Sequence, residues 1–541
     1  MKKKNVLIAA IVFVAVIALV AIVNAVGSGS FVGTAWALLP PLVAIALALI
    51  TKEAYSSLFI GVLLGAFMVA ECNVLNTVDI LTVDGLTTAL ADNAGIYVFL
   101  VILGIVVALI NKSGASRAFG NWAQSHIKTK TGAILATFLL GVLIFIDDYF
   151  NCLTVGSVMA PLTDSKKISR VKLAYIIDAT AAPVCMIAPV SSWAAAVSGC
   201  VESETYTGIG LFVRAIPYNF YSIFTLIFII AIAILGFDYG KMSSFEIKAA
   251  DGDLSILDVD ITKDKTARDV EENGPAKPGK GKIIDLVFPI IVLIVLCVWG
   301  LIRNGMQALG GEGTIIDAFN ETDSYVGLPW GSIIALVLIV VYLIIRKVIT
   351  FDEAMSCVPQ GFIAMVPAIT ILVLAQSLKG MTGMLDASTF VQAVVEKAGA
   401  IQFLLPALVF VIACVISFAT GTSWGTFGIL IPLVSAVFPE GNSLFFVGIS
   451  ACLAGSVCGD HCSPISDTTI MSSAGAHCNH LDHVETQLPY ALSVAAISFV
   501  TYILAGLFNL AGITWAAIPI GAVITVLFLI VMKKVAKKQA A

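Results

Sequence analysis

The amino-acid sequence predicts an all-α polytopic membrane protein, with about 12 transmembrane helices and two re-entrant hairpins. Of its 541 residues, 59% are hydrophobic and only 12% are charged, and the mean hydropathy is +1.01. A soluble domain carries about 25% charged residues. Apolar runs of spanning length recur along the whole chain, and polar breaks that contain proline interrupt several of them. These observations together indicate an integral membrane protein whose helices are not all continuous.

The apolar runs define the expected spans. A helix needs roughly 17–25 residues to cross the hydrocarbon core, and segments of this kind occur at 5–26, 34–50, 54–70, 94–111, 173–199, 211–236, 283–302, 328–346, 358–378, 444–475, 489–511 and 514–533. The first run is longer than the apolar region of a signal peptide, so we expect a retained helix. Residues 131–163 and 401–436 each hold two apolar runs separated by a polar kink, and we expect both to be re-entrant hairpins.

The distribution of Lys and Arg predicts the orientation. Basic residues cluster at 2–4, 112–130, 166–172, 241–282, 346–347 and 533–538. The loops 71–93 and 304–327 carry acids and no basic residue. Because basic loops stay in the cytoplasm, we expect both termini and the segment 237–282 to be cytoplasmic. That segment is charged and contains Pro and Gly, as is typical of a flexible linker.

The two sides of this linker resemble each other weakly. Three pairs of segments match in the same order at a spacing of about 267–275 residues: 154–162 with 426–433, 188–192 with 463–467, and 108–114 with 375–380. The loop charges make the spans 173–199 and 444–475 run in opposite directions. This is an inverted-topology repeat, which is typical of secondary transporters that bind solute at the midplane near broken helices. The expected units are 1–33, 34–236, 237–282, 283–511 and 512–541, namely an N-terminal helix, the first repeat, the linker, the second repeat and a C-terminal helix with a basic tail.

The tip of the first hairpin is acidic. Asp147 and Asp148 are adjacent, with Asn151 shortly after them. Carboxylate and amide oxygens are hard ligands that suit Na⁺. Alternatively, two neighbouring carboxyl groups share a proton, because they cannot easily ionise together. The competing interpretation is an acidic loop in water, which the flanking aromatic residues and basic segments make less favourable.

Asp178 lies in the next span, which the prolines at 183 and 189 are expected to break before Ser191 and Ser192. Broken helices expose N–H groups that bind anions and carbonyl groups that bind cations. The competing interpretation is that Asp178 forms an ion pair with Lys172 near the cytoplasmic surface.

The tip of the second hairpin is rich in hydroxyl groups and has no acid. We expect Thr420, Thr422 and Ser423 to face a dehydrated cation or the carboxylate of a substrate. The alternative is a plain turn whose hydroxyl groups face the surface.

The segment 458–469 carries the most informative residues. Asp460, His461 and Asp467 stand in an apolar context, where a charge is expensive by roughly 2.5–3.5 kcal/mol on insertion scales. A proline at 464 prevents a regular helix, and unwound backbone at membrane depth survives only inside protein or beside a cavity. His and a desolvated Asp exchange protons near neutral pH. We expect an ion or substrate site here that also includes Ser463, Ser466 and Thr468. The alternative is a structural cluster of hydrogen-bonded polar groups.

Three histidines follow, at 477, 480 and 483. No standard zinc spacing emerges from them, so we expect an interfacial or gating role at a cytoplasmic helix entry and favour this over a metal site.

The segments 459–490 and 145–151 resemble the NhaC-type sodium/proton antiporter family, and the resemblance covers most of residues 34–511. It implies a bacterial inner-membrane secondary transporter with a scaffold domain and a mobile transport domain that contains both hairpins. Elevator-type motion and a homodimer are implied in the same way. The transport domain would comprise 131–199 and 401–475. The family also includes sodium-coupled malate/lactate exchangers and amino-acid transporters.

The sequence is therefore compatible with two functions. The first is Na⁺/H⁺ antiport, in which cation and protons compete for carboxylates at the midplane. The second is Na⁺- or H⁺-coupled transport of a small organic acid or amino acid. No metalloprotease, nucleophile-elbow or Walker motif is present, so we expect no enzyme, no nucleic-acid partner and no cofactor other than Na⁺ and H⁺ as coupling ions.

Overall fold

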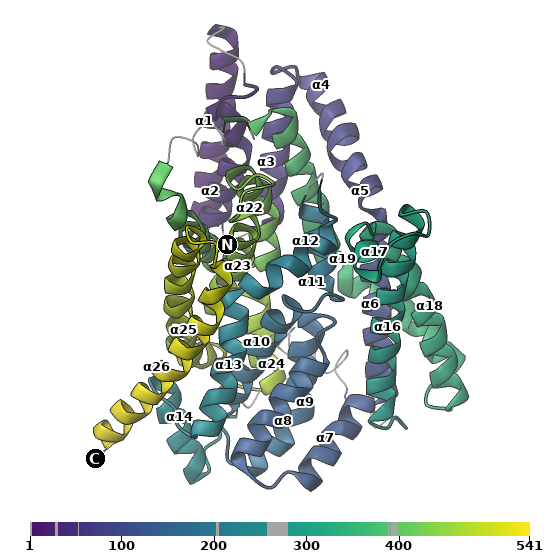
Figure 1. Ribbon diagram of the computed structural model, residues 1–541, viewed down its shortest axis with the longest axis vertical. Coiled ribbons are helices and arrows are strands. Elements are labelled where there is room, and N and C mark those ends of the chain that lie inside the picture. Colours follow the sequence, from purple (N-terminus) through teal and green to yellow (C-terminus); the bar gives the residue numbers. More distant parts are fainter. Residues whose placement is uncertain are drawn as a thin grey trace.

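The computed structural model describes residues 3–26, 31–51, 54–201, 205–256, 280–387, 389–390 and 399–540. Within these ranges the chain is helical and contains no strand, as Figure 1 shows, which confirms the predicted all-α class. The α-helices of the first half are α1 (Lys3–Val26), α2 (Leu39–Thr51), α3 (Ala54–Val69), α4 (Val74–Asp79), α5 (Thr88–Asp92), α6 (Ala94–Ser113), α7 (Ala115–His126), α8 (Lys130–Leu143), α9 (Asp148–Ser165), α10 (Arg170–Cys185), α11 (Ser192–Cys200), α12 (Gly208–Ala215), α13 (Phe220–Leu235) and α14 (Lys241–Asp251). Those of the second half are α16 (Ile284–Ala308), α17 (Ile315–Asn320), α18 (Ser324–Ile345), α19 (Phe351–Met384), α21 (Leu405–Thr420), α22 (Ser423–Val437), α23 (Phe445–Cys462), α24 (Asp467–Ala476), α25 (His480–Asn509) and α26 (Ala517–Ala540).

Many of these helices are long and apolar enough to cross a membrane. Among the described residues eight helices qualify, and up to ten do so if each of two bent pairs is one span. The protein is therefore a multi-pass membrane protein. One of the eight, residues 74–92, was expected to be an acidic loop. It forms a helix through α4, a π-helical segment Ile80–Thr87 and α5, because it lacks proline and contains only one glycine.

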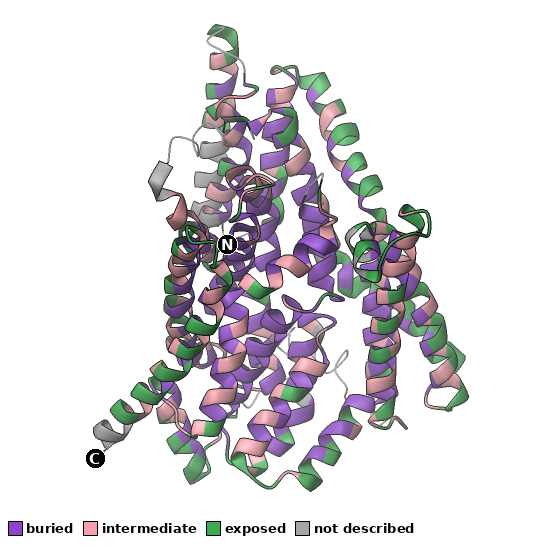
Figure 2. Cartoon of the chain, viewed as in Figure 1, coloured by how far each residue is buried: buried purple, intermediate pink, exposed green. Residues whose placement is uncertain are grey.

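The helices that hold the polar sequence motifs lie at the centre of the molecule. Figure 2 shows buried residues concentrated there, whereas exposed residues dominate α4 and are frequent on α26. Every residue of α10 is buried, and so is nearly every residue of α23. A helix that is buried all round has no polar face turned to solvent, so the charged residues of α10 and α23 must find partners inside the protein.

Two of the predicted spans consist of two short helices with an irregular break between them. The break between α10 and α11 follows Pro183 and contains Pro189, and the break between α23 and α24 contains Pro464. Proline lacks an N–H donor and clashes with the preceding turn. Ser191 and Ser466 each end a break as an N-cap, since their Oγ atoms accept from Ala194 N at 3.1 Å and Thr469 N at 3.3 Å. Such a cap supplies a partner for an N–H group that has none within the helix.

Each predicted hairpin is a pair of helices with a short tip. α8 and α9 are joined through residues 144–147, and α21 and α22 through residues 421–422. Gly421 has a φ of +67°, and a Cβ atom there would lie 2.5 Å from the carbonyl oxygen of Ile465, so only glycine fits this close approach. In Figure 1, α8 and α9 lie in the lower half of the view and α22 in the upper half.

The two halves have the same order of helices at one constant spacing. The helices α8, α9, α10 and α11 begin at Lys130, Asp148, Arg170 and Ser192. The helices α21, α22, α23 and α24 begin at Leu405, Ser423, Phe445 and Asp467, each 275 residues after its counterpart. In Figure 1 the path from α10 to α11 leads upward, and the path from α23 to α24 leads downward.

Part of the predicted linker is an ordered helix. α14 buries Met242 and Ala249, and its Glu246 accepts from Ser169 N at 2.8 Å and pairs with Lys130 at 2.6 Å. Residues 241–251 therefore form a helix and not the expected flexible linker. The sequence did not predict this helix, because the residues of its buried face stand among charged residues. Residues 257–279, the remainder of that prediction, lie outside the described part of the chain.

The two halves approach each other closely where α9 crosses α24. A Cβ atom on Gly156 would lie 2.6 Å from the carbonyl oxygen of Gly475, against backbone that cannot move aside easily. We predict that Gly156→Ala lowers the apparent melting temperature in detergent, since overpacking costs about 1–3 kcal/mol. Gly383→Ala is the control, because a Cβ atom there meets nothing within 4 Å. Equal melting temperatures for the two variants would contradict this close approach.

Candidate functional site

The first hairpin tip contacts the first helix break. Ser192 N donates to the carbonyl oxygen of Ile146 at 3.0 Å, and Cys185 Sγ donates to that of Phe145 at 3.0 Å. Trp193, at the start of α11, packs edge-on against Trp424 of α22 with ring centroids 5.7 Å apart. The tip, the break and the opposite hairpin therefore meet at one place.

The second hairpin tip contacts the second helix break in the same manner. Ser463 Oγ donates to the carbonyl oxygen of Phe418 at 2.7 Å, and Ser417 Oγ donates to that of Ser456 at 2.6 Å. The two assemblies are joined where Tyr149 OH donates to Asp467 Oδ2 at 3.4 Å. All four interruptions of regular helix thus lie together in the centre of the fold.

Asp460 occupies the last turn of α23 and is 5% exposed. The hydroxyl of Ser423 lies 2.8 Å from Asp460 Oδ2 and 3.1 Å from the carbonyl oxygen of Ser456, so it can donate to only one of them at a time. It donates to an ionised Asp460. It can instead accept from a protonated Asp460 and donate to the carbonyl. Asp460 Oδ1 is buried and has no hydrogen-bond partner. Asp460 Oδ2 therefore keeps its contact with Ser423 in both protonation states, and Oδ1 is left for a ligand.

The acids of the first hairpin tip are buried, with Asp147 2% and Asp148 1% exposed. Asn151 Nδ2 donates to the carbonyl oxygens of Gly141 at 2.7 Å and Ile144 at 3.0 Å, which satisfies the end of α8. Asn151 Oδ1 and Asp148 Oδ1 are buried without a hydrogen-bond partner. The alternative of an acidic loop in water does not hold, and the tip presents open acceptor oxygen atoms inside the protein.

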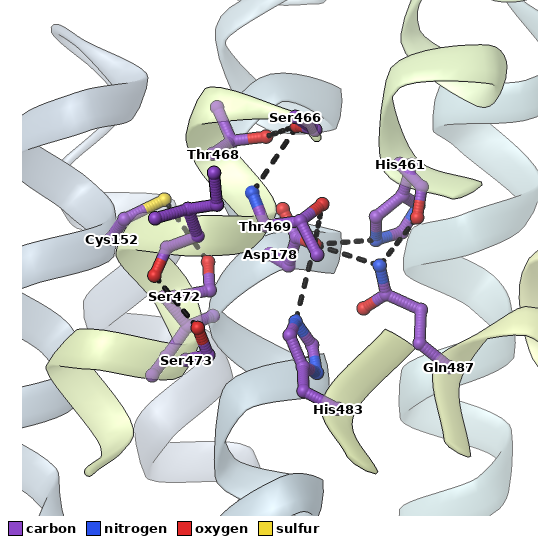
Figure 3. Close-up of polar contacts among 12 residues, drawn as sticks. Cys152, Asp178, His461, Ser466, Thr468, Thr469, Ser472, Ser473, His483 and Gln487 are labelled. Carbon is purple, nitrogen blue, oxygen red and sulfur yellow. Dashed lines mark hydrogen bonds and ion pairs between the residues drawn. The ribbon is translucent and has the colours of Figure 1, made fainter. Parts of the chain in front are cut away.

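Asp178 is the centre of a second group of polar contacts (Figure 3). Its Oδ2 accepts from Gln487 Nε2 at 2.7 Å and from Thr469 Oγ1 at 2.9 Å. The Nε2 atoms of His483 and His461 lie 3.4 Å and 3.9 Å from the same oxygen. The expected alternative, a pair with Lys172, is not formed.

Lys172 pairs instead with Asp238 at 2.7 Å, and Tyr490 OH donates to Asp238 at 2.8 Å. This contact holds the start of α10 against the segment that precedes α14. Asp178 therefore contacts the histidines and not Lys172.

The remaining predicted residues mainly terminate helices. Besides the caps formed by Ser191 and Ser466, Thr422 Oγ1 caps α22 by accepting from Gly425 N at 3.4 Å. Thr420 donates within its own helix to Ile416 O at 2.9 Å. Ser466 and Thr468 hydroxyls are 3.1 Å apart. Among the predicted site residues, Asp467 is exposed. Ser192 is buried, and its Oγ has no hydrogen-bond partner.

The histidines after α24 take different positions. His480 Nε2 lies 2.8 Å from the carbonyl oxygen of Pro464, so it contacts the second helix break directly. His483 is fully buried beside Asp178. No group of three or more His, Cys, Asp or Glu side chains that suits a metal ion occurs among the residues described by the structure.

Sequence reasoning missed Gln487 and Thr469 as partners of Asp178, and it placed His483 at an interface. A signal was available, because His483 and Gln487 are four residues apart and therefore share a helix face. The sequence does not indicate that this helix face contacts α10, which lies about 300 residues earlier in the chain.

The sequence of this chain is similar to those of a known protein family. The family model described as "Na+/H+ antiporter family" matches residues 187–507, more than half of the chain and most of the site. The chain belongs to the Na⁺/H⁺ antiporter family. The predicted NhaC-type resemblance is confirmed. Family membership makes the protein a secondary transporter in a lipid environment, whose substrates are ions or small solutes.

Curated relatives of this antiporter-family chain include an uncharacterized protein of Haemophilus influenzae, 37% identical over 92% of this chain and 96% of that protein. The arginine/ornithine antiporter ArcD of Halobacterium salinarum is 34% identical over 20% of this chain and 23% of its own length. The malate-2H(+)/Na(+)-lactate antiporter of Bacillus subtilis is 34% identical over 19% and 22%. The last two of these relatives are named as antiporters.

Two solved structures are also similar. Neisseria gonorrhoeae MtrF, described as illuminating a class of antimetabolite efflux pumps, has a TM-score of 0.43 and 12% identity over 80% of this chain and 84% of its own. The Alcanivorax borkumensis YdaH transporter has a TM-score of 0.44 and 14% identity over 82% and 90%. At these values the similarity carries no argument about this chain.

We predict that Ser466→Ala lowers the apparent melting temperature, because loss of an N-cap costs about 0.5–2 kcal/mol. Ser466→Thr keeps a capping hydroxyl and serves as the control, so it should melt close to the unmodified protein. Thermal unfolding in detergent compares the variants. If the alanine variant melts with the unmodified protein, Ser466 does not support the break.

Proposed function

We propose that this protein exchanges Na⁺ for protons across the membrane, with the two ions competing for carboxylates at the meeting of the hairpin tips and helix breaks. The observation that carries the proposal is Asp460. It is buried, it lies beside the Ser423 hydroxyl and the Ser456 carbonyl, and its Oδ1 has no protein partner. Oxygen ligands of this kind suit a hard cation such as Na⁺.

The first hairpin tip adds negative charge to the same region. Asp147 and Asp460 both lie close enough to Asp148 for their charges to act on it. Several carboxyl groups in one buried region cannot all ionise without a positive charge nearby. Either protons or a cation must therefore supply that charge, and the arrival of Na⁺ releases a proton to water. Exchange follows if the loaded site then faces the other side of the membrane.

A specific observation also favours a second candidate function. The local matches are to antiporters whose names specify arginine with ornithine, and malate with lactate. The hydroxyl-rich tip with Thr420, Thr422 and Ser423 lies within the site. In this candidate function, Na⁺ or H⁺ is the coupling ion and the solute is a small organic acid or amino acid.

Two observations support a proposal about the architecture, namely the constant 275-residue spacing of the central helices and their opposite paths in Figure 1. We propose twelve spans, two re-entrant hairpins, an inverted-topology repeat and an elevator-type transport domain of 131–199 and 401–475. The proposal includes the five sequence units already given, a homodimer in the bacterial inner membrane, cytoplasmic termini, and no cofactor besides the coupling ions.

The test of the proposed function uses purified protein in liposomes that contain a pH-sensitive dye. Addition of Na⁺ should evoke a proton flux, and Asp460→Asn should abolish it, because an amide cannot exchange a proton. A silent but folded and inserted protein would contradict Na⁺/H⁺ antiport. Thermal stabilisation by organic acids or amino acids, which follows from binding to the folded state, would then favour the second candidate.

A finer prediction concerns the hydroxyl that contacts Asp460. Ser423→Ala should weaken apparent Na⁺ affinity by about tenfold or more, since a hydrogen bond to a charged group contributes about 1.5–3 kcal/mol. The matched control is Ser498→Ala, because Ser498 is equally buried but donates only to Val494 O of its own helix. Concentration dependence of the flux measures both variants. An unchanged Na⁺ affinity in Ser423→Ala would remove Ser423 from the site.

A further inference from the structure

The exposed face of α16 carries a surface cavity of about 630 Å³ near the end of that helix. It is lined by the glycines of the following turn and by one side of α16, namely Trp299, Ile302, Arg303, Met306 and Gln307. We call it the Arg303 cavity. Arg303 is the one charged residue among the described residues that line it. The cavity therefore combines a mainly apolar wall with a single positive charge.

The guanidinium group of Arg303 is held in place but keeps most of its donors. It lies over the ring of Trp330 of α18, 4.6 Å from the ring centroid, and its Nη1 donates to Gln307 Oε1 at 3.2 Å. An arginine side chain carries five N–H donors. Within the described part of the chain, one of these donors has a hydrogen-bond partner, and no carboxylate pairs with Arg303. The remaining donors are left for an anion.

Two tightly packed helices fix the position of this guanidinium group. The rings of Trp299 on α16 and Trp330 on α18 meet edge to face, with centroids 4.8 Å apart. A Cβ atom on Gly331 would lie 2.3 Å from the carbonyl oxygen of Leu296, so the backbones of the two helices are in close contact. The aromatic surface beneath Arg303 is therefore set by the packing of α16 against α18.

The cavity lies where a spanning helix passes from hydrocarbon to head groups. Arg303 stands in the last two turns of α16, and Trp330 stands in the first two turns of α18. Tryptophan is enriched at membrane–water interfaces, and basic side chains near helix ends reach toward the head groups. Figure 1 shows α16 and α18 at the right-hand edge of the molecule. A molecule of the bilayer can therefore reach the cavity from the side.

An exposed apolar stripe on α16 leads to the cavity. Ile291, Val295 and Trp299 are 51%, 58% and 50% exposed. Because residues four apart are neighbours on one helix face, these side chains form a continuous track from the hydrocarbon region to Arg303. An acyl chain fits such a track while its phosphate reaches the guanidinium group. A free inorganic anion would contact the guanidinium group and leave the track uncovered.

We infer that the Arg303 cavity binds the head group of an anionic phospholipid, whose acyl chain lies along the stripe. Arginine forms paired hydrogen bonds with phosphate oxygens. A lipid with a net negative charge balances the single positive charge of the lining. A zwitterionic lipid would bring an ammonium group as well, and the described lining offers no carboxylate to contact it. The inference goes beyond the proposed function and holds for whichever solute is transported.

The test measures tryptophan fluorescence of the full-length protein in phosphatidylcholine nanodiscs that contain a small fraction of brominated lipid, because bromine quenches tryptophan at short range. Brominated phosphatidylglycerol should quench more than brominated phosphatidylcholine at the same fraction. Arg303→Ala should remove this excess, since loss of charged hydrogen bonds weakens binding about tenfold or more. Arg214→Ala is the matched control and should keep the excess. Arg214 also lies over an aromatic ring, that of Tyr206 at 4.8 Å, but outside the cavity.

A second variant locates the bound lipid. The chain has seven tryptophans, and Trp122 and Trp515 are also exposed, by 44% and 64%. Random contact with lipid quenches these two equally with either brominated lipid. In the double variant Trp299→Phe/Trp330→Phe the excess quenching by phosphatidylglycerol should disappear, whereas the quenching common to both lipids should remain.

Equal quenching by the two brominated lipids in the unmodified protein would overturn the inference, and so would an excess that survives in Arg303→Ala. If Arg303→Ala does not fold, an excess that survives in the double tryptophan variant overturns it instead. Excess quenching that inorganic phosphate abolishes would indicate a general anion site and not a lipid site. A second copy on this face would shield Trp299 from both lipids, and Arg303→Ala would then change the ratio of monomer to dimer in detergent. Either result would also overturn the inference.

Discussion

The structure depends on one constraint, which is that buried carboxyl groups in an apolar protein must be surrounded by polar partners. Asp148, Asp178 and Asp460 are each at most 5% exposed. A continuous helix uses its own N–H and carbonyl groups internally and offers none to a side chain. The breaks at the prolines and the two hairpin tips release such groups in the middle of the protein. Each acid lies near one of these interruptions, and each interruption contacts another across the two halves.

The two halves share one order of helices, and their interruptions carry different side chains. Four helices in each half begin 275 residues apart, so every break has a counterpart. The first hairpin tip carries Asp147 and Asp148, whereas the second carries Ser423 and its neighbouring threonines. Across the halves, Thr469 donates to Asp178 and Tyr149 donates to Asp467. The halves also approach each other closely where Gly156 of α9 meets Gly475 of α24.

Much of this arrangement is predictable from local sequence signals, and the rest depends on long-range packing. Composition and apolar runs predict the helical membrane class, and proline positions predict the breaks at 186–191 and 463–466. The helix within 241–251 was missed, because its three buried residues stand among charges. Gln487 was missed as a partner of Asp178, because 309 residues separate them and only the fold brings them together. Lys172 likewise finds Asp238 and not Asp178, although Asp178 is closer in the sequence.

The central claim is that Na⁺ and protons exclude each other in one connected polar region. The most direct measurement is the dissociation constant of Na⁺ for the purified protein as a function of pH, without transport. Competition with a single proton predicts that the apparent dissociation constant falls roughly tenfold for each unit of rising pH, until the proton site is empty. A dissociation constant that is the same at every pH would contradict the account, because Na⁺ would then bind without displacing a proton.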